Sequence, residues 1–165
     1  MKAYMMIGVP GSGKSTYAKK LIEIMEYINK NCKYIDKNCN IVYISRDEIR
    51  FSLLKEGDAY FSKENQVYKI FTDKIRENLK AGNDVIIDAT HMTWGSRHKV
   101  FKNLAGIDGV EVYGIWMRTS FMECAKRNQA REGKYRVPDN QFKNMVDNFE
   151  EPELDEGFKN IQEIW

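Results

Sequence analysis

Long apolar runs and cysteine are both scarce in this sequence, and each shortage excludes a class of protein. The chain has 165 residues, and its N-terminal apolar run, residues 3–7, is too short for a secretion signal or a membrane span. The three cysteines, Cys32, Cys39 and Cys124, are odd in number, and the first two are farther apart than the usual pair of zinc ligands. We therefore expect a soluble, cytoplasmic protein that makes no membrane contact and keeps its thiols reduced.

Internal repeats, low-complexity tracts and linkers long enough to divide the chain are also missing. A chain of this length buries a core of its own but is too short for a second catalytic unit. The sequence therefore predicts a single domain over residues 1–165 with a single function.

Positive charge is gathered in one part of the chain. The net charge is +2, yet residues 145–165 hold seven acidic side chains against one lysine, so the preceding residues carry a marked positive excess. Five basic residues lie within positions 126–136, namely Lys126, Arg127, Arg131, Lys134 and Arg136. Such a patch suits the phosphates of a nucleotide, of a nucleic acid, or of both. A solvated helix face is the alternative interpretation.

Residues 8–15 read G-V-P-G-S-G-K-S, which matches the phosphate-loop pattern G-x-x-x-x-G-K-[ST]. A strand-like run precedes it and helical periodicity follows, which is the context that this loop requires. The glycines let backbone N–H groups face an anion, and the N-terminus of the next helix adds positive potential. Lys14 is expected to reach the β- and γ-phosphates, and the Ser15 hydroxyl to ligate Mg²⁺. Expected contacts to ATP or another nucleoside triphosphate come from Gly11, Ser12, Gly13, Lys14, Ser15 and Thr16.

Strand and helix patterns alternate along the chain. Predicted strands are residues 3–7, 41–44, 85–87 and 110–117, with 158–165 as a weaker addition; predicted helices are 14–29, 67–79, 100–104, 120–132 and one after Pro138. Residues 29–40 read as a surface connection. Alternation at this spacing predicts an α/β fold, a doubly wound and mostly parallel sheet with helices on both faces.

Two aspartates follow predicted strands, where the ligand crevice of an open parallel sheet lies. Asp47 comes after strand 41–44 and Asp88 after strand 85–87. Asp47 can accept the proton of an attacking hydroxyl, and Arg50, three residues on along a helical turn, can bind a phosphate from the same face. Asp88 can hold Mg²⁺ through water or orient Arg50. Both aspartates could instead be helix caps.

Arg127 and Arg131 are four residues apart, so a helix would present both guanidinium groups on one face. An arginine over the γ-phosphate stabilises a phosphoryl-transfer transition state, and Gly133 can serve as a hinge. We interpret residues 127–140 as a helical lid, with a surface helix as the alternative. His91, in the loop after a strand, is either a substrate contact or an ordinary polar loop residue.

Four stretches together resemble the kinase domain of phage-type 5′-polynucleotide kinases: G-V-P-G-S-G-K-S-T, Arg46-Asp47-x-x-Arg50, Asp88-Ala-Thr, and Arg127-Asn-x-x-Arg131 leading to Val-Pro. The similarity covers nearly the whole chain, to Pro152. It implies ATP in the phosphate loop, Asp47 as general base on a 5′-hydroxyl of DNA or RNA, and Arg50 near the scissile phosphate. It also implies donor contacts from Arg127 and Arg131, and acceptor contacts from Arg50, Asp88, Thr90 and His91. The family often has Asn in place of His91.

Two other functions are compatible with the same phosphate loop. A kinase of a sugar, nucleoside or nucleotide sugar would share the fold and the loop, which do not fix the acceptor. An ATPase switch that transfers no phosphoryl group is the other. A GTPase is disfavoured because residues 29–32 lack the acid of N-K-x-D and no aspartate begins a D-x-x-G pattern.

Overall fold

The centre of the molecule is a five-stranded sheet in which every pair of neighbouring strands is parallel. A computed structural model describes residues 1–31 and 40–165. The strands are β1 (Lys2–Ile7), β2 (Ile41–Ser45), β3 (Asp84–Asp88), β4 (Glu111–Met117) and β5 (Asn160–Ile164), in the order β2-β3-β1-β4-β5. The helices are α1 (Lys14–Asn31), α2 (Arg46–Leu53), α3 (Glu64–Lys80), α4 (Trp94–Leu104), α5 (Phe121–Gln129) and α6 (Asp139–Asp147). Two 3-10 turns, Gly133–Tyr135 and Leu154–Glu156, complete the elements of the described part.

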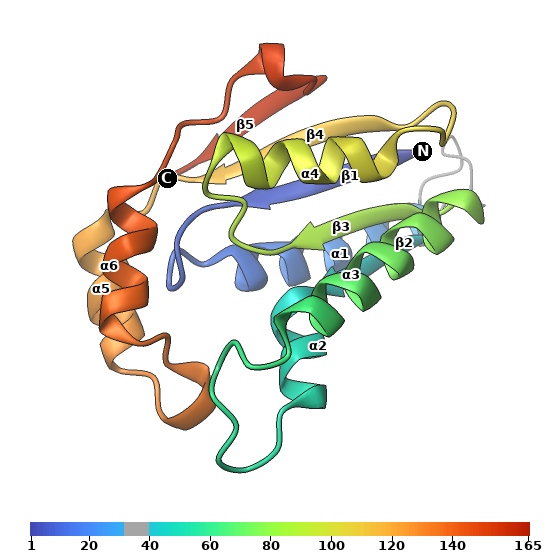
Figure 1. The fold of residues 1–165 in the computed structure, drawn as a ribbon. Coiled ribbons are helices and arrows are strands. Elements are labelled where there is room, and N and C mark those ends of the chain that lie inside the picture. Colours follow the sequence, from blue (N-terminus) through green and yellow to red (C-terminus); the bar gives the residue numbers. More distant parts are fainter. Residues whose placement is uncertain (32–39) are drawn as a thin grey trace.

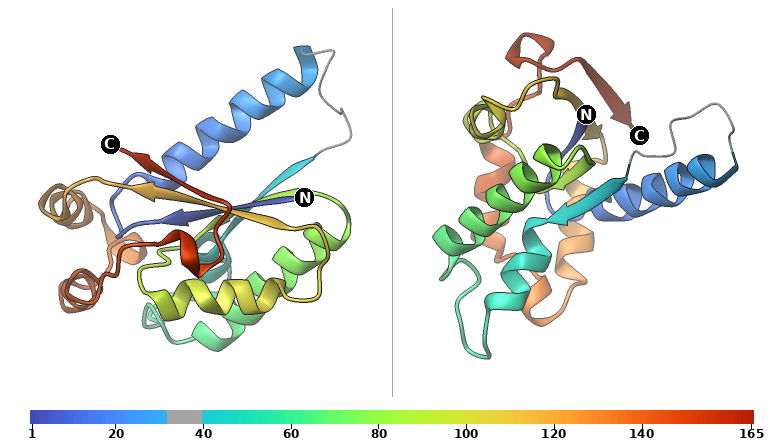
Figure 2. Two further views of the ribbon diagram at one scale, coloured as in Figure 1. Left: turned by 90° about the horizontal axis from the view of Figure 1, so that it is seen from above. Right: turned by 90° about the vertical axis from the view of Figure 1, so that its right-hand side faces the viewer.

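Helices cover both faces of this sheet, as the view along it shows (Figure 2). On one face, α1 packs through Ala18 against Met6 and Ile86. On the other, α3 and α4 bury apolar stripes against alternate residues of the same strands, such as Met5 and Ile87. Because successive strand residues point to opposite faces, both sides of β1 and β3 are apolar. This confirms the predicted doubly wound α/β architecture.

The carboxyl ends of the strands meet at one edge, where α5 and α6 stand (Figure 1). The register pairs Ser45 of β2 with Asp88 of β3, so the first turn of α2 begins beside the end of β3. The phosphate loop leaves β1 at the same edge. Topology alone therefore brings three of the predicted motifs together.

The observed boundaries correct several expectations. The helix predicted over 120–132 ends at Gln129, and the one predicted from 100 already begins at Trp94. Ser120 caps α5 by accepting from the Glu123 N–H, and the Glu123 carboxylate pairs with Arg127. The weakly predicted last strand is confirmed as β5. Of the predicted connection 29–40, residues 32–39, with Cys32 and Cys39, lie outside the described residues.

Within residues 1–31 and 40–165, no helix combines the length and the apolar character that crossing a membrane requires.

Candidate active site

The phosphate loop curls around the ammonium group of Lys14. Lys14 Nζ donates to the Val9 carbonyl oxygen at 2.9 Å and lies 3.4 Å from Ser12 Oγ, with 8% of the residue exposed. Burial lowers the pKa of Lys14, and the nearby Asp88 and Asp47 carboxylates oppose that shift. Gly11 has a φ of +85°, and a Cβ there would lie 2.6 Å from the Cys124 carbonyl oxygen. The loop therefore needs glycine at this position for both reasons.

Asp88, at the end of β3, is buried against the start of α1. Its Oδ2 accepts hydrogen bonds from Ser15 Oγ at 2.6 Å and from the Tyr43 hydroxyl at 2.5 Å. Burial and the Asp88 charge together raise the pKa of Tyr43, so this phenol remains a donor at neutral pH. Asp88 is thus fixed beside the hydroxyl that the motif assigns to a metal ion, and its predicted contact with Arg50 is not formed.

The pair Ser15 and Asp88 fits a magnesium ion. Both side chains offer hard oxygen donors, and their nearest oxygens are 2.6 Å apart. Magnesium prefers oxygen ligands and usually takes only one or two from protein, with phosphate oxygens and water filling the remaining positions. In the described ranges, no group of three or more His, Cys, Asp or Glu side chains forms a metal cluster.

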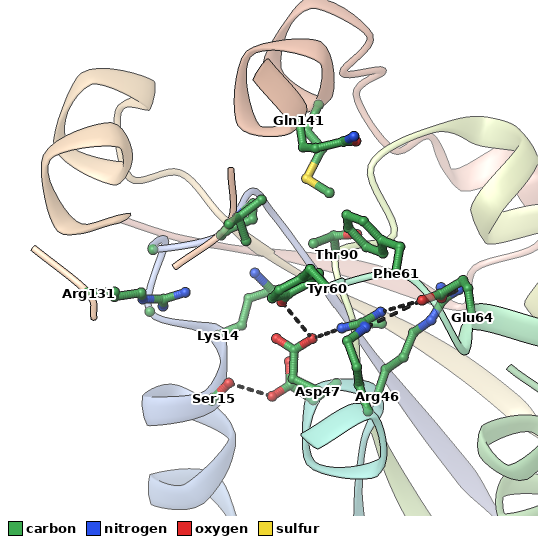
Figure 3. Close-up of a pocket in the computed structure, with 18 of the residues that line it drawn as sticks. Lys14, Ser15, Arg46, Asp47, Tyr60, Phe61, Glu64, Thr90, Arg131 and Gln141 are labelled. Carbon is green, nitrogen blue, oxygen red and sulfur yellow. Dashed lines mark hydrogen bonds and ion pairs between the residues drawn. The ribbon is translucent and has the colours of Figure 1, made fainter. Parts of the chain in front are cut away.

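Asp47 lies in the first turn of α2, whose N-cap is Ser45. Its side chain is 56% exposed, whereas that of its ion-pair partner Arg50 is 6% exposed. Arg50 Nη1 and the Tyr60 hydroxyl both donate to Oδ1 of Asp47. Oδ2 takes no hydrogen bond from the described residues, and the Asp47 side chain lies beside Lys14 and Tyr60 in the cavity (Figure 3). One oxygen of Asp47 is therefore held while the other is available.

Glu64, the first residue of α3, holds two arginines of α2. Its Oε2 accepts from Arg50 Nη2 at 2.9 Å, and its Oε1 pairs with Arg46 Nη2. Arg50 also lies over the rings of Tyr60 and Phe61, with its guanidinium carbon 4.9 and 5.2 Å from the two centroids. The Arg50 guanidinium is consequently fixed on several sides.

Arg131 and Arg127 separate after α5 ends. Arg131 lines the same cavity as Lys14 and Asp47. Arg127 instead pairs with Glu123 at 2.8 Å and donates to the Gly11 carbonyl oxygen at 3.3 Å. The predicted shared helical face is therefore not formed, because Arg131 lies two residues beyond the last helical residue.

The lid segment is tied back to α5 by Asn128. The buried amide of Asn128 donates to the Val137 carbonyl oxygen at 2.8 Å and accepts from the Val137 N–H at 3.1 Å. Between these points Gly133 has a φ of +54°, in the left-handed region that favours glycine. Residues 130–136 thus form a loop closed at its base.

One cavity of about 420 Å³ collects most of the predicted residues. It is lined by Gly11, Gly13, Lys14, Ser15, Thr16, Asp47, Arg50, Asp88, Thr90 and Arg131. Ser12, which belongs to the loop, and Arg127, which donates to the Gly11 carbonyl oxygen, do not line it.

His91 also lies outside this cavity. Its ring is buried, with Nδ1 2.7 Å from the Met6 carbonyl oxygen, and burial lowers its pKa to about 4. The structure therefore places His91 in the core, away from the predicted substrate contact.

Several lining residues escaped the sequence analysis. Tyr60 and Phe61 line the cavity from the α2–α3 connection and Glu64 from the start of α3. On the opposite side it is lined by Val137 and by two residues of α6, Gln141 and Met145. The stretch around Tyr60 has no periodicity and matches no motif, so only its aromatic content could have drawn attention. Arg46 also lines the cavity, and the sequence motif that contains it indicates no role for it.

The family of the chain follows from its sequence profile. The profile of AAA_33, described as an AAA domain, matches residues 4–152. The chain belongs to this AAA domain family. A viral protein named as a bifunctional polynucleotide kinase/RNA ligase, from Autographa californica nuclear polyhedrosis virus, is 26% identical over 144 residues. The match covers 79% of this chain and 18% of the relative, so the chain spans less than a fifth of that protein.

Solved structures share the fold of this AAA domain. Kti12 of Chaetomium thermophilum, solved in complex with ADP-AlF3, superposes with a TM-score of 0.74 at 15% identity, over 98% of this chain and 88% of that chain. A chain of the Pnkp1/Rnl/Hen1 complex gives 0.59 at 25% identity, over 76% and 38%. A gluconokinase from Sinorhizobium meliloti 1021 gives 0.57 at 16% identity, over 98% and 82%.

Together these findings establish a P-loop kinase fold with a nucleotide-binding loop, and they support a kinase-type enzyme. The neighbours include proteins named for polynucleotide and for sugar substrates, so they leave the acceptor open.

Proposed function

We propose that this AAA domain is an ATP- and Mg²⁺-dependent kinase that phosphorylates the 5′-hydroxyl of DNA or RNA. The observation that carries the proposal is the position of Asp47. Its carboxylate lines one cavity with Lys14 and is anchored through a single oxygen by Arg50 and Tyr60. A base between a phosphate-binding lysine and an anchored arginine is what transfer to a hydroxyl requires.

The donor half is built by the phosphate loop. Lys14 holds the β- and γ-phosphates, and the backbone N–H groups of the loop surround them. Mg²⁺, held by Ser15 beside Asp88, would neutralise charge on the phosphate oxygens. Arg131, from the lid side of the cavity, adds a second cation near the transferring group.

The acceptor half centres on Asp47 and Arg50. Asp47 accepts the proton of the acceptor hydroxyl while that oxygen bonds to the γ-phosphorus and the bond to the β–γ bridging oxygen breaks, which leaves ADP. Arg50, gripped by Asp47 and Glu64, binds a phosphate oxygen in a fixed orientation. The proton passes to Asp47 and the phosphoryl group to the acceptor hydroxyl, so the reaction needs no further reactant.

Three observations support a polynucleotide acceptor. The motifs around Asp47, Asp88 and Arg131 resemble those of 5′-polynucleotide kinases, and the viral relative is named for that activity. The basic residues at 126–136 lie on the proposed lid and the helix before it, and one of them, Arg131, lines the cavity.

The decisive experiment offers ATP labelled at the γ-phosphate to 5′-hydroxyl oligonucleotides and, in parallel, to a panel of nucleosides and sugars. We expect label transfer to the oligonucleotides and to 3′-phosphorylated nucleosides. Transfer to a free sugar or nucleoside alone would overturn the proposal in favour of a small-molecule kinase. Hydrolysis of ATP at a rate that no hydroxyl compound changes would indicate an ATPase.

A further inference from the structure

A second hollow adjoins the active-site cavity. Its volume is about 610 Å³, and it lies between the α2–α3 connection and the lid loop, with Tyr60 lining both hollows. The two segments lie side by side at the bottom of Figure 1, far apart in sequence. A ligand that extends out of the active-site cavity past Tyr60 therefore enters this second hollow.

Three aromatic rings meet beside this hollow, from α2, from the α2–α3 connection and from the lid loop. The rings of Phe51 and Tyr135 contact edge to face with centroids 4.9 Å apart, and Phe51 contacts Tyr60 in the same way at 6.1 Å. Tyr135 belongs to the lid turn and is 55% exposed. Its sequence neighbours Lys134 and Arg136 line the hollow, so this exposed ring lies beside it and offers a stacking face to a flat ligand.

A cation accompanies these rings. Lys134 Nζ lies 5.5 Å from the Phe51 centroid and 5.6 Å from that of Tyr135. It makes no ion pair with the described carboxylates, in contrast to Arg136 in the same hollow, which pairs with Asp139. Aromatic faces with an accompanying free ammonium group suit a base joined to a phosphate better than a neutral sugar.

We infer that the stacking groove, formed by Phe51, Tyr60, Lys134 and Tyr135, binds the nucleotide that follows the reacting 5′ end of a single-stranded acceptor. This inference rests on the proposed function. The second base stacks on Tyr135, and Lys134 contacts the adjoining phosphate. Stacking is open to every base, so the groove binds single strands without reading their sequence. A paired base is already stacked within its duplex and is a poorer ligand.

The test compares two acceptors, a 3′-phosphorylated nucleoside that fills only the active-site cavity and a 5′-hydroxyl single-stranded octamer. For Tyr135→Ala we expect the ratio of kcat/KM for the octamer to that for the mononucleotide to fall about tenfold, mainly through KM, which is within the range for one base–aromatic stack. Tyr135→Trp should keep the ratio. Tyr27→Ala removes another exposed tyrosine, from α1 and not among the residues that line either hollow, and should leave the ratio unchanged.

The proposed phosphate contact of Lys134 is tested by the salt dependence of octamer binding. In Lys134→Ala the slope of log affinity for the octamer against log salt should decrease by about 0.7, the value for one phosphate contact on a single strand, while Lys99→Ala on α4 leaves it unchanged.

If Tyr135→Ala lowered kcat/KM equally for both acceptors, or for neither, the proposed role of the stacking groove would be wrong. The proposal of polynucleotide kinase activity would still stand. Absence of transfer to any oligonucleotide by the wild-type protein would instead refute the proposed function itself.

Discussion

At the scale of single residues, the two oxygens of the Asp47 carboxylate are used differently. Oδ1 takes both contacts, from Arg50 and Tyr60, and Oδ2 takes none from the described residues. Burial and the Asp47 charge raise the pKa of Tyr60 to about 12, so its hydroxyl stays protonated as a donor. Asp47 is therefore oriented by neutral and cationic donors that do not compete with it for the acceptor proton.

The first prediction concerns Asp47→Asn. The amide keeps the size and one acceptor oxygen but cannot take a proton, so we expect kcat to fall by about 10² to 10⁴ while ATP affinity persists. Steady-state kinetics and nucleotide titration measure the two effects. Glu48→Gln is the matched control, because Glu48 is the next residue on α2 and does not line the cavity. Full activity of Asp47→Asn would remove Asp47 from the proposed role.

His91 links stability to pH. Its pKa in the folded chain is about 4, below the ordinary value of 6.5, because burial disfavours the charged ring. Between these two values the unfolded chain binds a proton that the folded chain does not, so stability falls as pH falls from about 6.5 to 4 and changes no further below that.

We therefore compare how much the unfolding free energy decreases between pH 8 and pH 5 in the wild-type protein and in His91→Asn. The decrease should be about 2 kcal/mol larger in the wild-type protein. Asparagine tolerates the left-handed backbone at this position, where φ is +45°, and it does not titrate. Urea denaturation at each pH measures the difference. Parallel stability curves for the two proteins would contradict the prediction.

At the scale of elements, the acceptor half depends on how α2 and α3 meet. Glu64 begins α3 and is the one carboxylate in the described ranges that pairs with both Arg46 and Arg50. We therefore expect Glu64 to act by positioning Arg50 in the proposed acceptor site.

The corresponding prediction is that Glu64→Gln raises the KM for the acceptor about tenfold, because Arg50 loses a charge-assisted hydrogen bond. The KM for ATP should change little. Glu77→Gln, on the exposed face of the same helix, serves as the control and should change neither. Equal changes in both KM values would indicate a general loss of structure instead of a positioning role.

The sequence predicted those elements whose pattern lies within a few neighbouring residues. Strands 41–44 and 85–87 are runs of β-branched residues, and the phosphate loop has a fixed spelling. Glu64 and Tyr60 were missed because their roles come from contact with α2, which no local pattern encodes. Arg131 was expected on a helix, since four-residue spacing cannot reveal that the helix ends at Gln129. His91 was expected in a polar loop, since polarity alone does not show that the backbone turns the ring inward.

At the scale of the whole molecule, Arg97 of α4 joins the segment between α6 and β5 to the loop that follows β3. Its buried guanidinium forms two hydrogen bonds of 2.7 Å to Glu156 and further bonds to the carbonyl oxygens of His91, Glu150 and Glu151. Residues 150–157 connect α6 to β5, so this one side chain holds the connection against α4.

We predict that Arg97→Met lowers the unfolding free energy by about 3–5 kcal/mol, because it leaves the buried Glu156 carboxylate without its cation. Adding Glu156→Leu should restore part of the loss. Lys69→Met, which breaks an exposed ion pair with Asp73, should have little effect. Denaturation in urea measures all three, and a loss in Arg97→Met no larger than in Lys69→Met would contradict the prediction.

The uneven charge of the chain leads to a last prediction. Positive excess before residue 145 should make oligonucleotide affinity fall about twentyfold between 50 and 200 mM salt, as expected for about three phosphate contacts on a single strand. Fluorescence anisotropy with a labelled single strand measures it. An uncharged methylphosphonate strand of the same sequence should show no such dependence, and equal behaviour of the two strands would contradict an electrostatic origin.

The close approach of Gly11 to Cys124 has a mechanical consequence. With no space between the loop and α5, and with Arg127 bonded to the Gly11 carbonyl oxygen, the donor site and this helix form one rigid unit. We therefore expect any motion of the proposed lid to be confined to the residues after Gln129. Substitutions on the inner side of α5 should therefore register as defects in nucleotide binding, although that helix contributes no wall to the cavity.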